Sequence, residues 1–327
     1  MAVFTEVTQT DAQALLDTLH LGDLVSLRGI QGGIENTNYF LTTRKDNEEK
    51  EWVLTLFERL SAEQLPFYLD LMHHLASAGI PVPDPFADPQ GRHLLSLCGK
   101  PAALVNKLSG SSQLSPGPEH CQEVGRTLAQ MHLAAREYSG NQPNLRGLSW
   151  WQAVVPDVVP HIDPSQVKLL TSELAYQIHV HHSSAYAALP RGPVHADLFR
   201  DNVMFDGDRL TGVFDFYFAG VDTWLFDLAV CINDWCADLD SGALSTDRLH
   251  ALLGAYESVR PLTAAEHALF NPMLRAAAMR FWTSRLWDFY LPREASMLQP
   301  HDPKRFENVL RQRIHQPFHF NQTTTPA

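Results

Sequence analysis

Cysteine is scarce in this sequence, and the few that occur exclude two common kinds of site. The four cysteines are Cys98, Cys121, Cys231 and Cys236. Their spacing fits neither a Cys-x-x-Cys redox motif nor a usual zinc knuckle. We therefore expect all four to be buried free thiols.

Long apolar runs and an excess of positive charge are also missing. No segment approaches the unbroken apolar length that spans a bilayer, and residues 1–10 have neither a basic start nor an apolar stretch. Acidic residues outnumber basic ones by 37 to 25, which gives a formal net charge of −12 and disfavours nucleic acids and anionic membranes as partners. The sequence predicts a soluble cytoplasmic protein, and it leaves the oligomeric state open.

The first hundred or so residues predict a small sheet with one main helix. Two strands are expected within 24–44, a third over 51–57 and a hairpin over 92–108. Helices are expected to begin at two capping boxes, Thr10-x-x-Gln13 and Ser61-x-x-Gln64.

The remainder of the chain is dominated by helical periodicity. One helix is predicted to begin after the Ser115-Pro116 pair, and a long one to run from the Thr263-x-x-Glu266 capping box to about Tyr290. The fold class is therefore α+β. We predict a domain of residues 1–105 and a helical domain of residues 106–327.

The clearest chemical pattern is formed by Asp197, Asn202 and Asp215. An Asp206-Gly207 turn between two short predicted strands folds the chain back, so we expect Asn202 and Asp215 to lie side by side. Amide and carboxylate oxygens suit Mg²⁺, and Asp197 suits a base that orients an acceptor hydroxyl. The pattern indicates phosphoryl transfer from ATP.

Residues for nucleotide binding are predicted in two places. A glycine pair between the first two strands offers bare backbone amides to a phosphate, although such a pair also suits an ordinary turn. Short polar side chains follow it, and the segment 103–110 between the two domains offers its backbone to an adenine edge. The candidates are Gly32, Gly33, Asn36, Thr37, Asn106 and Leu108.

These residues resemble a known group of enzymes. The pattern of Asp197, Asn202 and Asp215, with His195 just before it, is similar to the aminoglycoside-phosphotransferase and choline-kinase group, the small-molecule relatives of protein kinases. Three segments further resemble the homoserine kinases of this fold: residues 32–41, 196–210 and 214–219.

The resemblance implies a two-lobed, protein-kinase-like fold with a small antiparallel-sheet N-lobe and a mainly helical C-lobe. It implies ATP and Mg²⁺ as cofactors, and transfer of the γ-phosphoryl group to L-homoserine to give O-phospho-L-homoserine in threonine biosynthesis. It assigns Asp197 as the catalytic base, and Asn202 and Asp215 as the metal ligands.

The sequence departs from the wider kinase pattern at one position. That pattern has a lysine in the third strand, where it neutralises nucleotide phosphates, but Thr55 occupies the aligned position here. Three other cations could take its place, and the sequence does not choose between Arg59, Lys50 and Lys45.

Candidates for acceptor recognition are weaker. Asp234 is a candidate for an ammonium group, and Arg280 and Arg285 are candidates for a carboxylate. Asp227 is instead interpreted as a brace for the catalytic loop. Another small-molecule kinase, for choline, ethanolamine, hydroxylysine or a sugar, remains an alternative, as does a nucleotide-binding pseudokinase.

Overall fold

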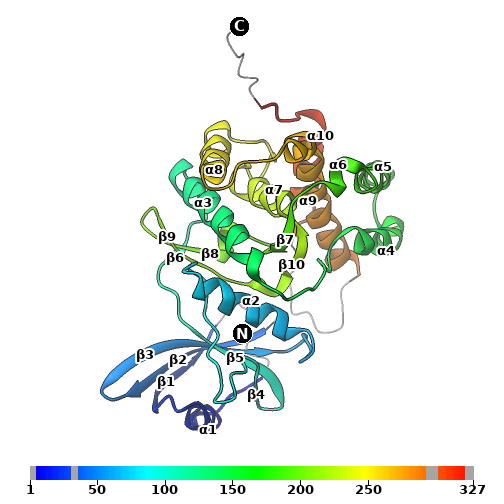
Figure 1. Ribbon diagram of the computed structural model, residues 1–327. Helices are drawn as coiled ribbons and strands as arrows, with labels where there is room; N and C mark the ends of the chain where they lie inside the picture. Colours follow the sequence, from blue (N-terminus) through cyan, green and yellow to red (C-terminus); the bar gives the residue numbers. More distant parts are fainter. Residues whose placement is uncertain (1–4, 31–35, 292–300, 321–327) are drawn as a thin grey trace.

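The computed structural model describes residues 5–30, 36–291 and 301–320, and it confirms the α+β fold. A five-stranded antiparallel sheet forms most of the N-lobe, and helices dominate the C-lobe (Figure 1). Within the described ranges, none of the helices combines the length and the apolar character needed to cross a bilayer.

The sheet of the N-lobe has its strands in the order β1-β2-β3-β5-β4, with antiparallel neighbours throughout. Its strands are β1 (Asp23–Gly29), β2 (Asn36–Lys45), β3 (Glu48–Phe57), β4 (Leu95–Leu97) and β5 (Lys100–Asn106). The three predicted strand regions and the predicted hairpin are therefore confirmed. The boundary at residues 105 and 106 stays a prediction, and it lies at the end of β5.

The two faces of this sheet have different partners, because successive side chains of a strand point to opposite sides. The side chains of Tyr39, Leu41, Trp52 and Leu54 form an apolar cluster with α1 (Gln9–Leu19), and we call this side the outer face. Phe57 and Ala103 point the other way and belong to the core shared with the C-lobe. Figure 1 shows α2 (Leu65–Ser77) between this inner face and the helices of the C-lobe.

Three helix starts differ from their predictions. Helix α1 begins earlier than expected, because Thr8 and Asp11 form the capping box instead of Thr10 and Gln13. Helix α2 begins at Leu65, because residues 62–64 form a turn, although the Gln64 side chain accepts from Ser61 N as a capping box at Ser61 requires. Helix α3 begins at Pro118, one proline later than predicted.

The C-lobe is built around α7, in which every residue is buried. The capping box of Thr263 and Glu266 opens α9 as predicted. The helices are α3 (Pro118–Ala134), α4 (Leu148–Val158), α5 (Pro164–His181), α6 (Ser184–Ala187), α7 (Trp224–Trp235), α8 (Thr246–Val259), α9 (Ala264–Tyr290) and α10 (Lys304–His315).

Two small sheets carry the segments with the predicted chemistry. Strand β7 (Arg191–Val194) pairs with β10 (Gly220–Thr223), and β6 (Ser111–Ser112) pairs with the hairpin of β8 (Val203–Asp206) and β9 (Arg209–Val213). Short 3-10 turns, η3 (Arg200–Asn202) and η4 (Phe216–Phe218), flank this hairpin. The hairpin confirms the predicted turn, in which Gly207 has a φ of 58°.

The prediction of buried thiols is wrong for one of the four cysteines. Cys121, Cys231 and Cys236 are buried, but Cys98 is exposed. It lies in the turn between β4 and β5 with a φ of 51°, and this turn carries its side chain out of the sheet.

Candidate active site

The loop after β7 is held in an unusual conformation just before Asp197. Ala196 is buried and has a φ of 62°, a left-handed conformation that a residue with a side chain adopts only when its surroundings enforce it. The ring of His195 is bonded through Nε2 to the carbonyl oxygen of Phe214, at 2.9 Å, so this loop is tied to the segment that carries Asp215.

Asp227 enforces this conformation from α7. Its carboxylate accepts hydrogen bonds from the backbone N–H groups of His195, at 2.9 Å, and Ala196, at 2.7 Å, and it pairs with His132 at 3.1 Å. Burial alone would raise the pKa of Asp227, but the bonds from His132 and the backbone more than offset this and hold that pKa below its usual range. The prediction that Asp227 braces the loop is confirmed.

Asp197 and Asn202 are linked directly. The Asn202 amide nitrogen donates to the Asp197 backbone carbonyl at 2.8 Å and to Asp197 Oδ2 at 3.3 Å. Because both contacts use the nitrogen, they orient the amide and leave its Oδ1 for a ligand. Phe214 N donates to the carbonyl oxygen of Asn202 at 3.0 Å, which brings the next residue, Asp215, beside Asn202 as the hairpin predicted.

The residues present fit a hard divalent cation. The fixed amide of Asn202 offers a neutral oxygen, and Asp215 offers a carboxylate from a left-handed backbone conformation with a φ of 66°. Oxygen donors of this kind are those that Mg²⁺ prefers. Asp215 is also close enough to Asp197 to influence its ionisation.

The carboxyl of Asp197 lies between unlike charges. Burial raises its pKa well above the usual range, the nearby Arg280 guanidinium counteracts this, and Asp215 raises the pKa further. Arg280 Nη1 is 3.9 Å from Asp197 Oδ1. One carboxylate oxygen of Asp197 therefore faces Asn202, and the other faces Arg280 on α9. We call the side of Asp197 that faces Arg280 the acceptor side.

The predicted nucleotide-binding residues have different surroundings. Gly32 and Gly33 lie outside the described residues, whereas Asn36 begins β2 next to them. The Thr37 side chain points to the outer face, is fully buried and donates to Glu58 at 2.7 Å, so it cannot contact a ligand on the inner face. The strand register therefore leaves only the Thr37 backbone for a ligand on that face, and the role of Thr37 in nucleotide binding stays a prediction.

The connection between the lobes offers mainly its backbone. Asn106 accepts a hydrogen bond through its side-chain Oδ1 from Asp84 N at 2.6 Å. The Leu108 side chain lies against Gly212 of β9, where a Cβ would come within 2.5 Å of Leu108 Cδ1. Gly212 therefore permits the segment after β5 to pack on the catalytic hairpin, and the role of Asn106 and Leu108 in adenine binding stays a prediction.

In β3, a neutral and hydrogen-bonded side chain, Thr55, occupies the position where the wider kinase pattern has a lysine. Thr55 Oγ1 donates to Asn38 Oδ1 at 2.7 Å, and Thr55 also bonds the hydroxyl of Tyr217 from η4. These contacts link β2, β3 and the segment after Asp215 without a cation. Lys45 and Lys50 cannot supply one, because strand alternation places both on the outer face, where Lys45 donates to His20 O at 2.9 Å.

Arg59 is thus the remaining candidate of the three, since it follows the end of β3 where Phe57 pairs with Asn36. We expect Arg59→Gln to raise the KM for ATP by about fivefold or more, because a charged contact to phosphate is lost. Initial rates at varied ATP measure this, with Lys50→Gln as the matched control on the outer face. Equal KM values for both variants would contradict the assignment to Arg59.

The three acceptor candidates have different contacts. The Asp234 carboxylate is buried, accepts from Arg200 N at 2.9 Å and forms ion pairs with Arg200 and Arg305. These contacts make Asp234 a brace between η3, α7 and α10 and give no support to ammonium binding. Arg285 lies over the ring of Phe306, 4.5 Å from its centre.

Sequence reasoning missed a group around Arg280. Arg280 lies over Phe218, whose ring is also 6.0 Å from the guanidinium of Arg146, and Arg146 lies over Trp150 and Trp287. Arg146 precedes α4 and Trp287 lies on α9, so no local spacing connects them. The only signal was the abundance of aromatic residues near these arginines.

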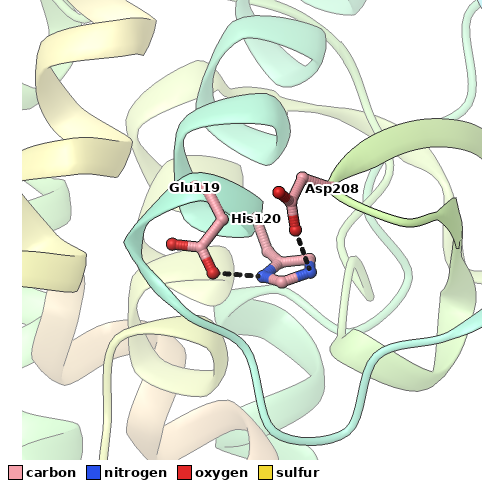
Figure 2. Close-up of side chains that lie close together, drawn as sticks. All are labelled: Glu119, His120 and Asp208. Carbon is pink, nitrogen blue, oxygen red and sulfur yellow. Dashed lines mark ion pairs between the residues drawn. The ribbon is translucent and has the colours of Figure 1, made fainter.

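A second group of potential metal ligands lies elsewhere, at the start of α3. Figure 2 shows the ring of His120 between two carboxylates, with Glu119 3.2 Å from Nδ1 and Asp208 3.5 Å from Nε2. Because the carboxylates approach opposite edges of the ring, one ion bound to a ring nitrogen cannot also take both of them as ligands. This group connects α3 to the β8–β9 turn instead.

Comparison with known proteins identifies the family. Residues 26–262 match the phosphotransferase enzyme family. Proteins named homoserine kinase from Polaromonas naphthalenivorans and Cupriavidus metallidurans are 58% and 56% identical, over 97% and 96% of this chain and 99% and 97% of theirs. A solved amicoumacin kinase in complex with AMP-PNP and Ca²⁺ has a TM-score of 0.70 at 16% identity, covering 97% of this chain and 98% of that one, which shows a shared fold. The chain belongs to the phosphotransferase enzyme family, together with these relatives named homoserine kinase.

Proposed function

We propose that this chain is a cytoplasmic homoserine kinase, which uses ATP and Mg²⁺ to convert L-homoserine to O-phospho-L-homoserine for threonine biosynthesis. The observation that best supports phosphoryl transfer is the pair of hydrogen bonds from the Asn202 amide to Asp197, with Asp215 beside Asn202. The acceptor is supported by relatives of nearly the same length that are named for it.

In this mechanism the chain mainly positions its substrates. Asn202 Oδ1 and the Asp215 carboxylate would hold Mg²⁺, which supplies charge neutralisation at the transferring phosphoryl group. Asp197 accepts a hydrogen bond from the substrate hydroxyl, aligns it and takes its proton. The hydroxyl oxygen bonds to the γ-phosphorus, the bond from that phosphorus to the bridging oxygen breaks, and ADP leaves.

The geometry of Asp197 explains why it can act in this way. Asn202 fixes one side of the carboxylate, and Asp227 fixes the backbone immediately before it. A base held by its surroundings does not need to be ordered during the reaction, which lowers the entropic part of the barrier. The carboxylate is only 15% exposed, so few water molecules compete with the substrate hydroxyl.

A panel of acceptors tests the proposal. ADP release should be measured with L-homoserine, choline, ethanolamine, L-serine and hydroxylysine at equal concentrations. We expect kcat/KM for homoserine to exceed that for every other acceptor by about 10² or more, since a site built for one set of polar groups discriminates strongly against analogues that lack them. Faster turnover of another acceptor would refute the homoserine assignment, and ATP binding without any turnover would refute the kinase assignment.

A further inference from the structure

Two arginines that are distant in sequence meet at one aromatic ring beside Asp197. The guanidinium carbon of Arg280 is 5.1 Å from the centre of the Phe218 ring, and that of Arg146 is 6.0 Å from it. The two cations repel each other enough to influence the ionisation of Arg280. The carboxylates of Asp197 and Asp288 act in the opposite direction and favour the charged form of Arg280.

The guanidinium of Arg280 has few direct contacts with acceptors. Its side chain is 4% exposed, and Nε and Nη2 are buried without a hydrogen-bond partner among the described residues. Among the same residues, its ion pair is the long contact to Asp197. A buried charged group that forms no hydrogen bonds is costly, and proteins retain such groups where a ligand supplies the missing acceptor.

Arg280 also remains a cation under ordinary conditions. Burial lowers its pKa, but only to about 10, so the guanidinium is protonated at neutral pH. Phe281 also lies close to this group, with the ring centre 3.7 Å from the guanidinium carbon. The two rings hold the planar group in one orientation, which is the requirement for binding a planar anion.

Arg146 precedes α4 and is only half buried. Trp150 and Trp287 lie within 4.5 and 5.3 Å of its guanidinium carbon, and their rings contact each other edge to face. These contacts fix a long side chain that would otherwise be mobile. Both guanidinium groups are therefore positioned before any ligand arrives.

We propose that Arg280 and Arg146, which both lie near the Phe218 ring, form the subsite for the α-carboxylate of the acceptor. This inference rests on the proposed function and extends it, because it assigns the group that separates an amino-acid acceptor from a simple amino alcohol. L-Homoserine has only a short carbon chain between its hydroxyl and its carboxylate. A hydroxyl bonded to Asp197 thus brings the carboxylate close to Arg280, whose Nη1 is 3.9 Å from Asp197 Oδ1.

A pair of acceptors tests the carboxylate contact directly. 3-Aminopropan-1-ol is homoserine without its carboxylate, so kcat/KM should be measured for both compounds with the wild type, Arg280→Gln and Arg146→Gln. We expect Arg280→Gln to lower kcat/KM for homoserine by about tenfold or more and that for aminopropanol by less than about threefold. Arg146→Gln should show the same selective loss, and Arg209→Gln, an exposed control in β9, should change neither value.

A binding measurement separates recognition from catalysis. L-2-Aminobutyrate keeps the carboxylate and the ammonium group of homoserine but has no hydroxyl, and its Kd can be measured by calorimetry. We expect Arg280→Gln to weaken its binding by about tenfold or more, while the Kd for ATP stays unchanged. If Arg280→Gln does not fold, Arg146→Gln provides the same test at a half-buried position.

The outcomes distinguish this proposal from the one on which it rests. Equal losses for homoserine and aminopropanol, with unchanged aminobutyrate binding, would show that Arg280 acts on Asp197 or on the phosphoryl group, and would overturn the subsite. A wild type that prefers an acceptor without a carboxylate would instead overturn the homoserine kinase proposal.

Discussion

We expect Asp197→Asn to lower kcat by on the order of 10² or more while ATP binds with an unchanged Kd. The substitution keeps the shape of the side chain and removes only its charge and its ability to take a proton. Because Asp197 lies in the C-lobe and its carboxylate faces the acceptor side, its substitution should not change the nucleotide-binding surface of the N-lobe. Single-turnover phosphoryl transfer and calorimetric titration with ATP measure the two quantities.

Asp201→Asn is the matched control for this variant. Asp201 lies in the same loop, four residues further along, but its side chain is exposed. The control should retain kcat within about twofold, because solvent screens this exposed charge and it affects the ionisation of Asp197 less than burial, Arg280 and Asp215 do. An Asp197→Asn variant with wild-type kcat would remove Asp197 from the role of base, and loss of ATP binding would point to a misfolded site.

The second large effect is expected at Asp227. Asp227→Asn should lower the free energy of unfolding by about 3 kcal/mol, because it weakens a buried hydrogen bond between His132 and a carboxylate and presents an N–H group to a backbone donor. It should also lower kcat by about tenfold or more, since Ala196 loses the acceptor that holds its backbone. Urea unfolding and initial rates measure the two effects.

The stabilisation that Asp227 provides should depend on pH in a definite direction. The pKa of Asp227 is lower in the folded protein than its unfolded value of about 3.9, so its stabilisation is fully present above that value and disappears as pH falls through the folded pKa. The difference in unfolding free energy between wild type and Asp227→Asn should therefore be constant near neutral pH and shrink below about pH 4. Asp240→Asn, in an exposed loop, should show no difference at either pH.

Local signals in the sequence predict much of the fold. The Asp206-Gly207 turn locates the β8–β9 hairpin, and the Thr263 and Glu266 capping box locates the start of α9, because each depends on residues that are close in sequence. The start of α1 differs from its prediction because two capping patterns overlap there. The structure has the capping box of Thr8 and Asp11, and the predicted one was that of Thr10 and Gln13.

In the active site, too, local contacts could be predicted from the sequence, and contacts between distant residues could not. Asn202 and Asp215 flank one hairpin, so their proximity follows from turn chemistry, and Asp197 lies only five residues before Asn202. The orientation of the Thr37 side chain toward the outer sheet surface could not be predicted, because a strand's register shows only after pairing with β3 is known. Arg146 meets α9 through contacts between residues more than a hundred positions apart, which no local pattern reveals.

The exposure of Cys98 makes the enzyme suitable for spectroscopy without added mutations. A maleimide dye reacts with an accessible thiol, and the other three cysteines are enclosed in the C-lobe. Partial burial and the nearby Asp11 raise the pKa of the Cys98 thiol, so alkaline buffer speeds its labelling. A fluorophore at this position resides on the N-lobe, and it can report movement of that lobe relative to the C-lobe when the substrates bind.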